Sequence, residues 1–336
     1  MLTNLLEYHW AEDIDDALLL LSRSNTKTLP LAGGTYLLGL QDESIQAVVD
    51  LRDLELAYIS EDARGVHIGA MTTLQAIVDS AVLKEFAVGL LSRAAQASSF
   101  SRLIRDSATL GGTLGAGIAS QADLLTALAI LDAGAIVRSA SKTQVNLSAG
   151  TDEHPGLALS GVTFKGKQER RVACNAISKE RRPNELIVEV IISRPNYTCG
   201  TSFTRVGRTS TDVALLNAAA LVEVKDGVYS QVRLALGGVN MEPVRMLAVE
   251  KQLAGQAVEA DTTAQNAEMN TFIAQLQRAV QTGMADFQPP SDFRASSEYR
   301  QESGMNLAYR VLEEAANISR WRSMVGRNQM GPYGRS

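Results

Sequence analysis

Cysteine and histidine are scarce in this chain of 336 residues, which contains two cysteines and three histidines. Two cysteines build no disulfide framework, and they are too few to hold an iron–sulfur cluster by themselves. His9, His67 and His154 are scattered along the chain and have no histidine partner one helical turn away. A zinc site formed by this chain is therefore not expected.

Long apolar runs and an excess of basic residues are also missing. The longest apolar stretch, LLTALAILDAGAIV from Leu124, is too short to span a bilayer and contains Asp132. The N-terminus is acidic and lacks the basic region and apolar core of a signal peptide. The net charge is −5, and two short basic runs that begin at Lys165 and Lys179 are interpreted as solvated loops or hairpins. We therefore expect a cytoplasmic protein with no membrane span and no nucleic-acid partner.

The chain has the composition of a globular protein, with 45% apolar and 21% charged residues. Its first half alternates helical and strand patterns, and short strands and polar turns follow from about Val162. Helices are predicted over residues 11–21, 72–83 (with Thr72 or Thr73 as N-cap), 84–104, 124–131, the 260s and 270s, and 298–318; strands are predicted over 47–51, 65–71, 135–140 and 185–192; residues 212–239 are predicted as helix, strand, Lys-Asp-Gly hairpin and strand.

Two segments share the pattern apolar, Gly-Gly, Thr, apolar: LAGGTYL at residues 31–37 and TLGGTLG at 109–115. Consecutive glycines adopt positive φ without steric cost, and successive amides then converge into a concave site for an anion. One pair alone is a weak signal, because any Gly-Gly can be a turn. Two such loops predict a clasp for a pyrophosphate, with a further donor from the hydroxyl of Thr35 or Thr113.

The familiar nucleotide motifs are absent from this chain. The Walker pattern is missing, and no G-x-G-x-x-G stands at a strand–helix junction near the start. The glycine pairs therefore indicate a different pyrophosphate-binding fold. Asp123, at the start of an apolar helix, has two readings. It is either an acid stabilised by the helix dipole or a carboxylate that accepts hydroxyls from the sugar or ribitol chain of a cofactor.

Several blocks occur in order: LAGGT, IRDSATLGG, ADLLTALAILDA, SFTRVGRTSTDVALLNAAA, LALGGVNMEPVR and DFRASSEYR. From about residue 5 to 315 the chain resembles the FAD-binding medium subunit of the molybdenum hydroxylases, the group of xanthine dehydrogenase and carbon monoxide dehydrogenase. The resemblance implies an α+β fold: a two-lobed FAD-binding domain of the vanillyl-alcohol oxidase type, followed by an α+β C-terminal domain. The expected FAD-binding domain is 1–175 (lobes about 1–55 and 56–175), the connection 176–196 and the C-terminal domain 197–320.

The resemblance also implies a role in electron transfer. In the family, a molybdopterin-binding large subunit oxidises the substrate, a small subunit carries [2Fe-2S] clusters, and FAD passes the electrons to NAD⁺ or another acceptor. The chain is thus expected to be an FAD-dependent oxidoreductase subunit with these two partner subunits. Two alternatives stay open: a non-catalytic assembly subunit that has lost tight flavin binding, and a stand-alone flavin reductase that uses NAD(P)H.

The family's cofactor contacts transfer to this chain position by position, and no catalytic acid, base, nucleophile or metal ligand is expected. The family pattern has another residue type at Tyr36, Thr113 and Thr204, which is the basis of the assembly-subunit alternative. The contacts implied are Leu31, Ala32, Gly33, Gly34, Thr35, Tyr36 and Leu37 in the first pyrophosphate loop; Thr109, Leu110, Gly111, Gly112 and Thr113 in the second; Asp123 at the ribityl chain or ribose; Ile187 beside the isoalloxazine; and Phe203 and Thr204 near the flavin.

Overall fold

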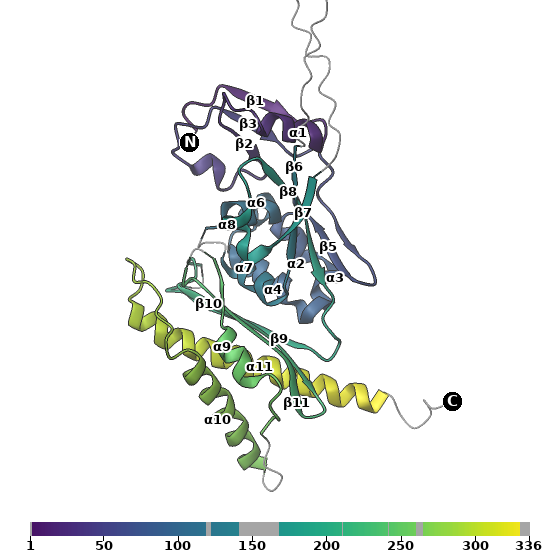
Figure 1. Cartoon of the computed structure of the whole chain (residues 1–336), viewed down its shortest axis with the longest axis vertical. Helices are drawn as coiled ribbons and strands as arrows, with labels where there is room; N and C mark the ends of the chain where they lie inside the picture. The colour runs from purple at the N-terminus through teal and green to yellow at the C-terminus, as the bar shows by residue number, and fades with distance from the viewer. Residues whose placement is uncertain are drawn as a thin grey trace, which may run out of the picture.

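Three β-sheets follow one another along the long axis of the molecule in the computed structural model (Figure 1). The structure describes residues 2–118, 122–140, 168–209, 211–240, 242–259 and 265–329. His154 and the start of the basic run at Lys165 lie outside these residues. Helices and sheets occur in each part of the molecule, which confirms the α+β class.

The first lobe is a small parallel sheet at the N-terminal end. Its strand order is β1-β3-β2. All of β3 is buried, because the lobe's core joins α1 to residues of the second lobe, such as Leu186. The predicted helix begins after Asp13, whose carboxylate accepts a hydrogen bond from the amide of Asp16 at 2.8 Å. The elements are β1 (Glu7–Trp10), α1 (Ile14–Leu21), β2 (Thr28–Leu31), η1 (Leu37–Gly39) and β3 (Ala47–Asp50).

The second lobe is built on a five-stranded sheet in which every strand pair is antiparallel, with the order β4-β5-β8-β6-β7. Residues 176–196, expected to be a connection, contain the central strand of this sheet. The chain therefore returns to the second lobe after residue 175. The strands are β4 (Ile59–Glu61), β5 (Gly65–Gly69), β6 (Gly134–Ser139), β7 (Gln168–Ala173) and β8 (Glu185–Ser193).

The helices of the second lobe correct two predictions. Residues 72–83 form two helices that meet at Ser80, although Thr73 is an N-cap as expected. The predicted helix over 84–104 begins only at Leu90, because Ala87 and Val88 have φ of 48° and 58°, outside the right-handed region. The helices are α2 (Leu74–Asp79), α3 (Ala81–Glu85), η2 (Phe86–Gly89), α4 (Leu90–Ser98), α5 (Arg102–Ser107), α6 (Leu110–Ala116), α7 (Ala122–Ile130), η4 (Cys174–Ala176) and α8 (Ile177–Glu180).

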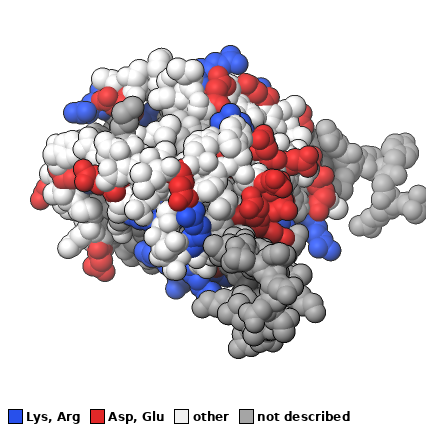
Figure 2. All heavy atoms as spheres, turned by 90° about the horizontal axis from the view of Figure 1, so that it is seen from above, with Lys and Arg blue, Asp and Glu red and all other residues white. Residues whose placement is uncertain are grey.

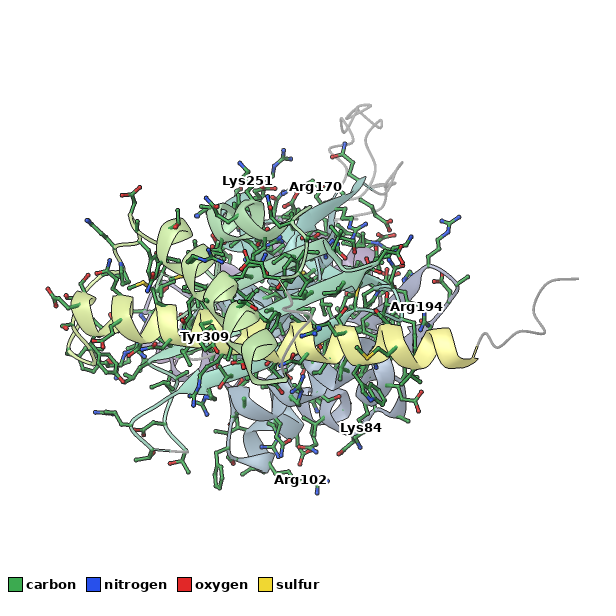
Figure 3. All side chains as sticks on the ribbon, turned by 90° about the horizontal axis from the view of Figure 1, so that it is seen from below. Lys84, Arg102, Arg170, Arg194, Lys251 and Tyr309 are labelled. Atoms are coloured by element: carbon green, nitrogen blue, oxygen red, sulfur yellow. The ribbon has the colours of Figure 1, made fainter. Side chains whose placement is uncertain are left out.

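The C-terminal domain is a four-stranded antiparallel sheet, ordered β12-β11-β10-β9, with a long helix across one face. Figure 3 shows this helix, which carries Tyr309, running across the molecule. The Lys-Asp-Gly hairpin is confirmed: Asp226 and Gly227 have φ of 53° and 77°, as in a type I′ turn. The elements are β9 (Gly200–Val206), β10 (Leu216–Lys225), β11 (Val228–Gly237), β12 (Val244–Arg245), α9 (Leu247–Leu253), α10 (Gln265–Gly283) and α11 (Ser297–Gln329).

The alanine-rich segment DVALLNAAA was predicted as a helix, and this prediction is wrong. From Leu216 onward it forms β10, which is buried along its first nine residues. One face of the strand packs against α11 and the other against α7. The small side chains of Ala218, Ala219 and Ala220 allow both helices to approach, so burial on two faces overrides the helical preference of alanine.

The surface at the N-terminal end carries few charges over a broad area, with acidic residues gathered to one side (Figure 2). On β1, Tyr8 and Trp10 point outward and are exposed by 44% and 56%. The guanidinium of Arg52 lies 5.2 Å from the centre of the Trp10 ring. Within the described ranges, no helix combines the length and apolarity needed to cross a membrane.

Candidate functional site

A cleft between the first and second lobes brings the two glycine segments together. The free space along this cleft is about 930 Å³, part of which is open solvent. Ten of the sixteen predicted cofactor contacts line it: Ala32, Gly33, Gly34, Thr35, Tyr36, Leu37, Thr109, Gly111, Gly112 and Ile187.

Glycine is required where the two segments meet. A Cβ atom on Gly33 would lie 1.6 Å from the carbonyl oxygen of Ser107, so any side chain there would push the first loop away from the second lobe. A Cβ on Gly112 would lie 2.9 Å from the hydroxyl oxygen of Thr109 and 3.9 Å from the Cβ of Ala32 in the first loop. The two segments, far apart in the sequence, are therefore in close approach.

The first loop, which lines the cleft, contains a run of backbone amides without an acceptor in the described part of the chain. Within the described residues, the amides of 32–36 donate no hydrogen bond to a protein acceptor. Gly34 has φ of +70°, which glycine adopts without the penalty of a side chain. Because unpaired backbone donors need water or a ligand, this loop fits the oxygens of a diphosphate.

The second segment differs from the prediction, because its amides are already used. Those of Leu110 and Gly111 donate to the carbonyl oxygens of Thr72 and Ala70, at 2.9 and 2.8 Å. The amide of Gly112 donates to the hydroxyl of Thr109, the N-cap of α6, at 3.1 Å. The expectation of a second loop of free amides is therefore wrong: the segment is the first turn of a helix, with glycine surfaces facing the cleft.

Three other predicted contacts lie behind the cleft wall. Leu31, Leu110 and Thr113 are 8%, 1% and 1% exposed, and none of them lines the cleft. The Thr113 hydroxyl has no hydrogen-bond partner among the described residues. A buried hydroxyl without a hydrogen-bond partner is unfavourable. In α6, Thr113 directly follows Gly111 and Gly112, which line the cleft.

Asp123 lies at the boundary with the C-terminal sheet, outside the lining of the cleft. One carboxylate oxygen accepts a hydrogen bond from the Asn217 amide at 2.7 Å, and the other lies 3.5 Å from Nε of Arg205. Asn217 in turn accepts a hydrogen bond from Thr126 at 2.7 Å. Burial raises the pKa of Asp123, while Arg205 and Asn217 oppose that rise. The carboxylate therefore ties α7 to β9 and β10.

Phe203 and Thr204 point to opposite faces of β9. Phe203 packs against the core of the second lobe. Ser202, two residues before Thr204, donates to Glu314 of α11 at 2.6 Å, and alternation along a strand places Thr204 on the same α11 face. Neither residue lines the cleft.

Two charged residues of the lining were not predicted from the sequence as site residues. Arg181 and Glu185 flank the start of β8, next to Ile187. The run that contains Arg181 was interpreted as a solvated loop, and only its position just before the strand of Ile187 was a signal. Hydrogen bonds from Arg170 hold the pKa of Glu185 below its usual value. Burial lowers the pKa of Arg181, and Glu185 opposes this effect.

Comparison with known proteins identifies both parts of the chain. Residues 4–151 match the FAD binding domain in molybdopterin dehydrogenase, and residues 201–315 match the CO dehydrogenase flavoprotein C-terminal domain. The glyceraldehyde dehydrogenase medium chain of Sulfolobus acidocaldarius is 28% identical over 92% of this chain and 98% of its own length. The xanthine dehydrogenase FAD-binding subunit of Escherichia coli O157:H7 is 27% identical over 92% and 95%.

The fold agrees with a solved structure of Cu,Mo-CO dehydrogenase. One of its chains superposes with a TM-score of 0.74, at 24% identity, over 95% of this chain and 100% of that chain. The order of a two-lobed FAD-binding domain and a C-terminal α+β domain is thereby confirmed.

Proposed function

Because the chain belongs to the FAD-binding medium subunits of the molybdenum hydroxylases, we propose that it transfers electrons from the [2Fe-2S] clusters of a small partner subunit to NAD⁺ or another acceptor. A molybdopterin-binding large subunit is the second proposed partner. Bound FAD supplies the redox chemistry, because it accepts electrons singly and releases them singly or as a pair. The chain itself supplies binding, orientation and electrostatics.

The first loop is the observation that carries this proposal. Residues 32 to 36 line a cleft that the second lobe closes, and within the described residues their five consecutive amides donate to no protein acceptor. Such amides suit the diphosphate of FAD, because each can donate a hydrogen bond to a phosphate oxygen without the help of a charged side chain. Ile187, 6% exposed in the same lining, offers an apolar contact to an aromatic ring.

The test begins with the purified full-length chain. We expect it to carry FAD, or to bind added FAD, with the flavin absorbance and quenched fluorescence of a bound cofactor. Capture of the tagged chain from its own host should then recover one large and one small partner, with molybdenum and iron in the isolated complex. A chain that binds no FAD contradicts the proposal, and so does a captured complex without molybdenum.

The amides of the second segment already donate hydrogen bonds within the protein, and this favours one alternative, an assembly subunit that binds flavin weakly. In that case the isolated chain would capture the same partners but show no flavin absorbance. The ratio of FAD to protein in the captured complex separates the two functions.

A further inference from the structure

Arg181 differs from Glu185, the other charged residue of the cleft lining, because it forms no ion pair among the described residues. Its Nη1 atom donates to the carbonyl oxygens of Glu185, at 2.9 Å, and of Arg182, at 3.3 Å. No carboxylate oxygen in the described part of the chain lies within 4.0 Å of its guanidinium nitrogens. These bonds fix the side chain at the start of β8 and use only one of its nitrogens.

The acidic residue of the lining makes its close contacts with other groups. Glu185 is paired with Arg170, at 2.8 Å to Nε and 2.7 Å to Nη2, and accepts the amide of Arg182 at 2.7 Å. Figure 3 labels Arg170 on the side of the molecule opposite Lys84 and Arg102. The described lining thus contains one cation, Arg181, and one anion, Glu185, and Glu185 forms its ion pair with Arg170, which lies outside the lining. Among the described residues, Arg181 is left without a carboxylate at ion-pair distance.

A half-buried guanidinium without a carboxylate is unfavourable, because burial removes part of its hydration. An anion in the cleft would relieve this cost. The planar donor fork of arginine suits phosphate oxygens, and such charge-assisted hydrogen bonds are stronger than those from neutral amides.

We propose that Arg181 binds a phosphate oxygen of the FAD diphosphate, in the cleft that the first loop also lines. The inference rests on the proposed function. It adds a cationic contact to the neutral amides of the first loop. It also replaces the amide donors of the second segment, which are used in hydrogen bonds within the protein.

The test measures the Kd of FAD by fluorescence quenching, with the full-length chain freed of cofactor, at several salt concentrations. Arg181→Gln should weaken binding by about 10- to 100-fold, the range of a lost charge-assisted hydrogen bond, and should flatten the salt dependence. Arg181→Lys keeps the charge, so it should keep the salt dependence and lose less affinity. Arg182→Gln is the matched control, because Arg182 is the exposed neighbour in the same turn and should bind FAD as the wild type does.

Three outcomes would overturn the inference. The first is an Arg181→Gln chain that binds FAD with the wild-type Kd. The second is an equal loss in Arg182→Gln. The third is an equal loss in the Gln and Lys variants with unchanged salt dependence, which would assign Arg181 a purely structural role through its bonds to the two carbonyls. A wild-type chain that binds no FAD would refute the proposed function itself, and the inference with it.

Discussion

The two glycine segments share a sequence pattern but not a structure. In the first, the amides of residues 32–36 bond to no acceptor in the described protein, and Gly33 is needed because a Cβ atom there would lie 1.6 Å from the carbonyl oxygen of Ser107. In the second, the amides of residues 110–113 bond within the protein, and the segment is the first turn of α6. The same three letters, Gly-Gly-Thr after an apolar residue, thus form a loop of unbonded amides in one place and the first turn of a helix in the other.

The difference arises from what surrounds each segment. The first loop follows β2, an edge strand of a small sheet. The second lies against β5 and the loop after it, whose carbonyls at Ala70 and Thr72 take two of its amides. Four substitutions test this division of roles, in decreasing order of expected effect.

Gly33→Ala should destabilise the folded chain most. Its Cβ would lie 1.6 Å from the backbone oxygen of Ser107, which no side-chain movement relieves. We expect the free energy of unfolding to fall by about 3 kcal/mol, at the upper end of overpacking effects. Urea unfolding of the cofactor-free chain measures it. A loss below about 1 kcal/mol would mean that the loops separate easily, and that their approach is not fixed by glycine.

Gly112→Asp should abolish FAD retention and cost about 1 kcal/mol of stability, because its Cβ would lie 2.9 Å from the N-cap hydroxyl of Thr109 and displace it. The carboxylate would enter the cleft beside Ala32, where it would repel a diphosphate, while an acid in the first turn of α6 favours the helix. We expect FAD affinity to fall by about 100-fold or more, since juxtaposed like charges cost several kcal/mol. Gly112→Asn, similar in size but neutral, is the control and should lose less. Equal losses would show that size alone, and not charge, excludes the ligand.

Thr109→Ala tests the cap that occupies the Gly112 amide. Removing the hydroxyl should lower the free energy of unfolding by about 1 kcal/mol, as expected for a lost N-cap. Thr109→Ser keeps the hydroxyl and should be nearly neutral. Thermal unfolding of the two variants gives the difference. If the Ala variant is as stable as the Ser variant, the cap does not hold the second segment in its helical form.

Gly115→Ala should have the smallest effect, and a stabilising one. Its Cβ would meet no atom within 4 Å, and the residue lies inside α6. Replacing glycine by alanine within a helix contributes about 0.5–1 kcal/mol. A raised melting temperature of the cofactor-free chain is the expected result. Destabilisation would indicate that this turn needs the flexibility of glycine.

Local patterns predicted the regular elements well where one periodicity dominated. The strands predicted at residues 47–51, 65–71 and 185–192 are found at 47–50, 65–69 and 185–193, and Thr73 is an N-cap as predicted. The pattern misled at 216–220, where alanine favours a helix but two-sided burial imposes a strand. It also misled at 84–104, where positive φ at Ala87 and Val88 delays the helix.

The candidate site was predicted only in part. Both glycine segments and Ile187 do meet at one cleft. Asp123 and Phe203 lie instead at the boundary with the C-terminal sheet, and their role toward a flavin stays a prediction. Arg181 was missed, because the sequence of a basic run does not show which of its side chains lines a cleft.

The order and spacing of its motifs are enough to assign this chain to its family and to an α+β fold, because those features are properties of the linear chain. Which amides stay free, which carboxylate pairs with Arg170 and which arginine faces the cleft depend on neighbours distant in sequence. Hydrogen bonds and charges act over a few ångströms, so these outcomes were decided only when folding placed β5, α6 and β8 beside the first loop.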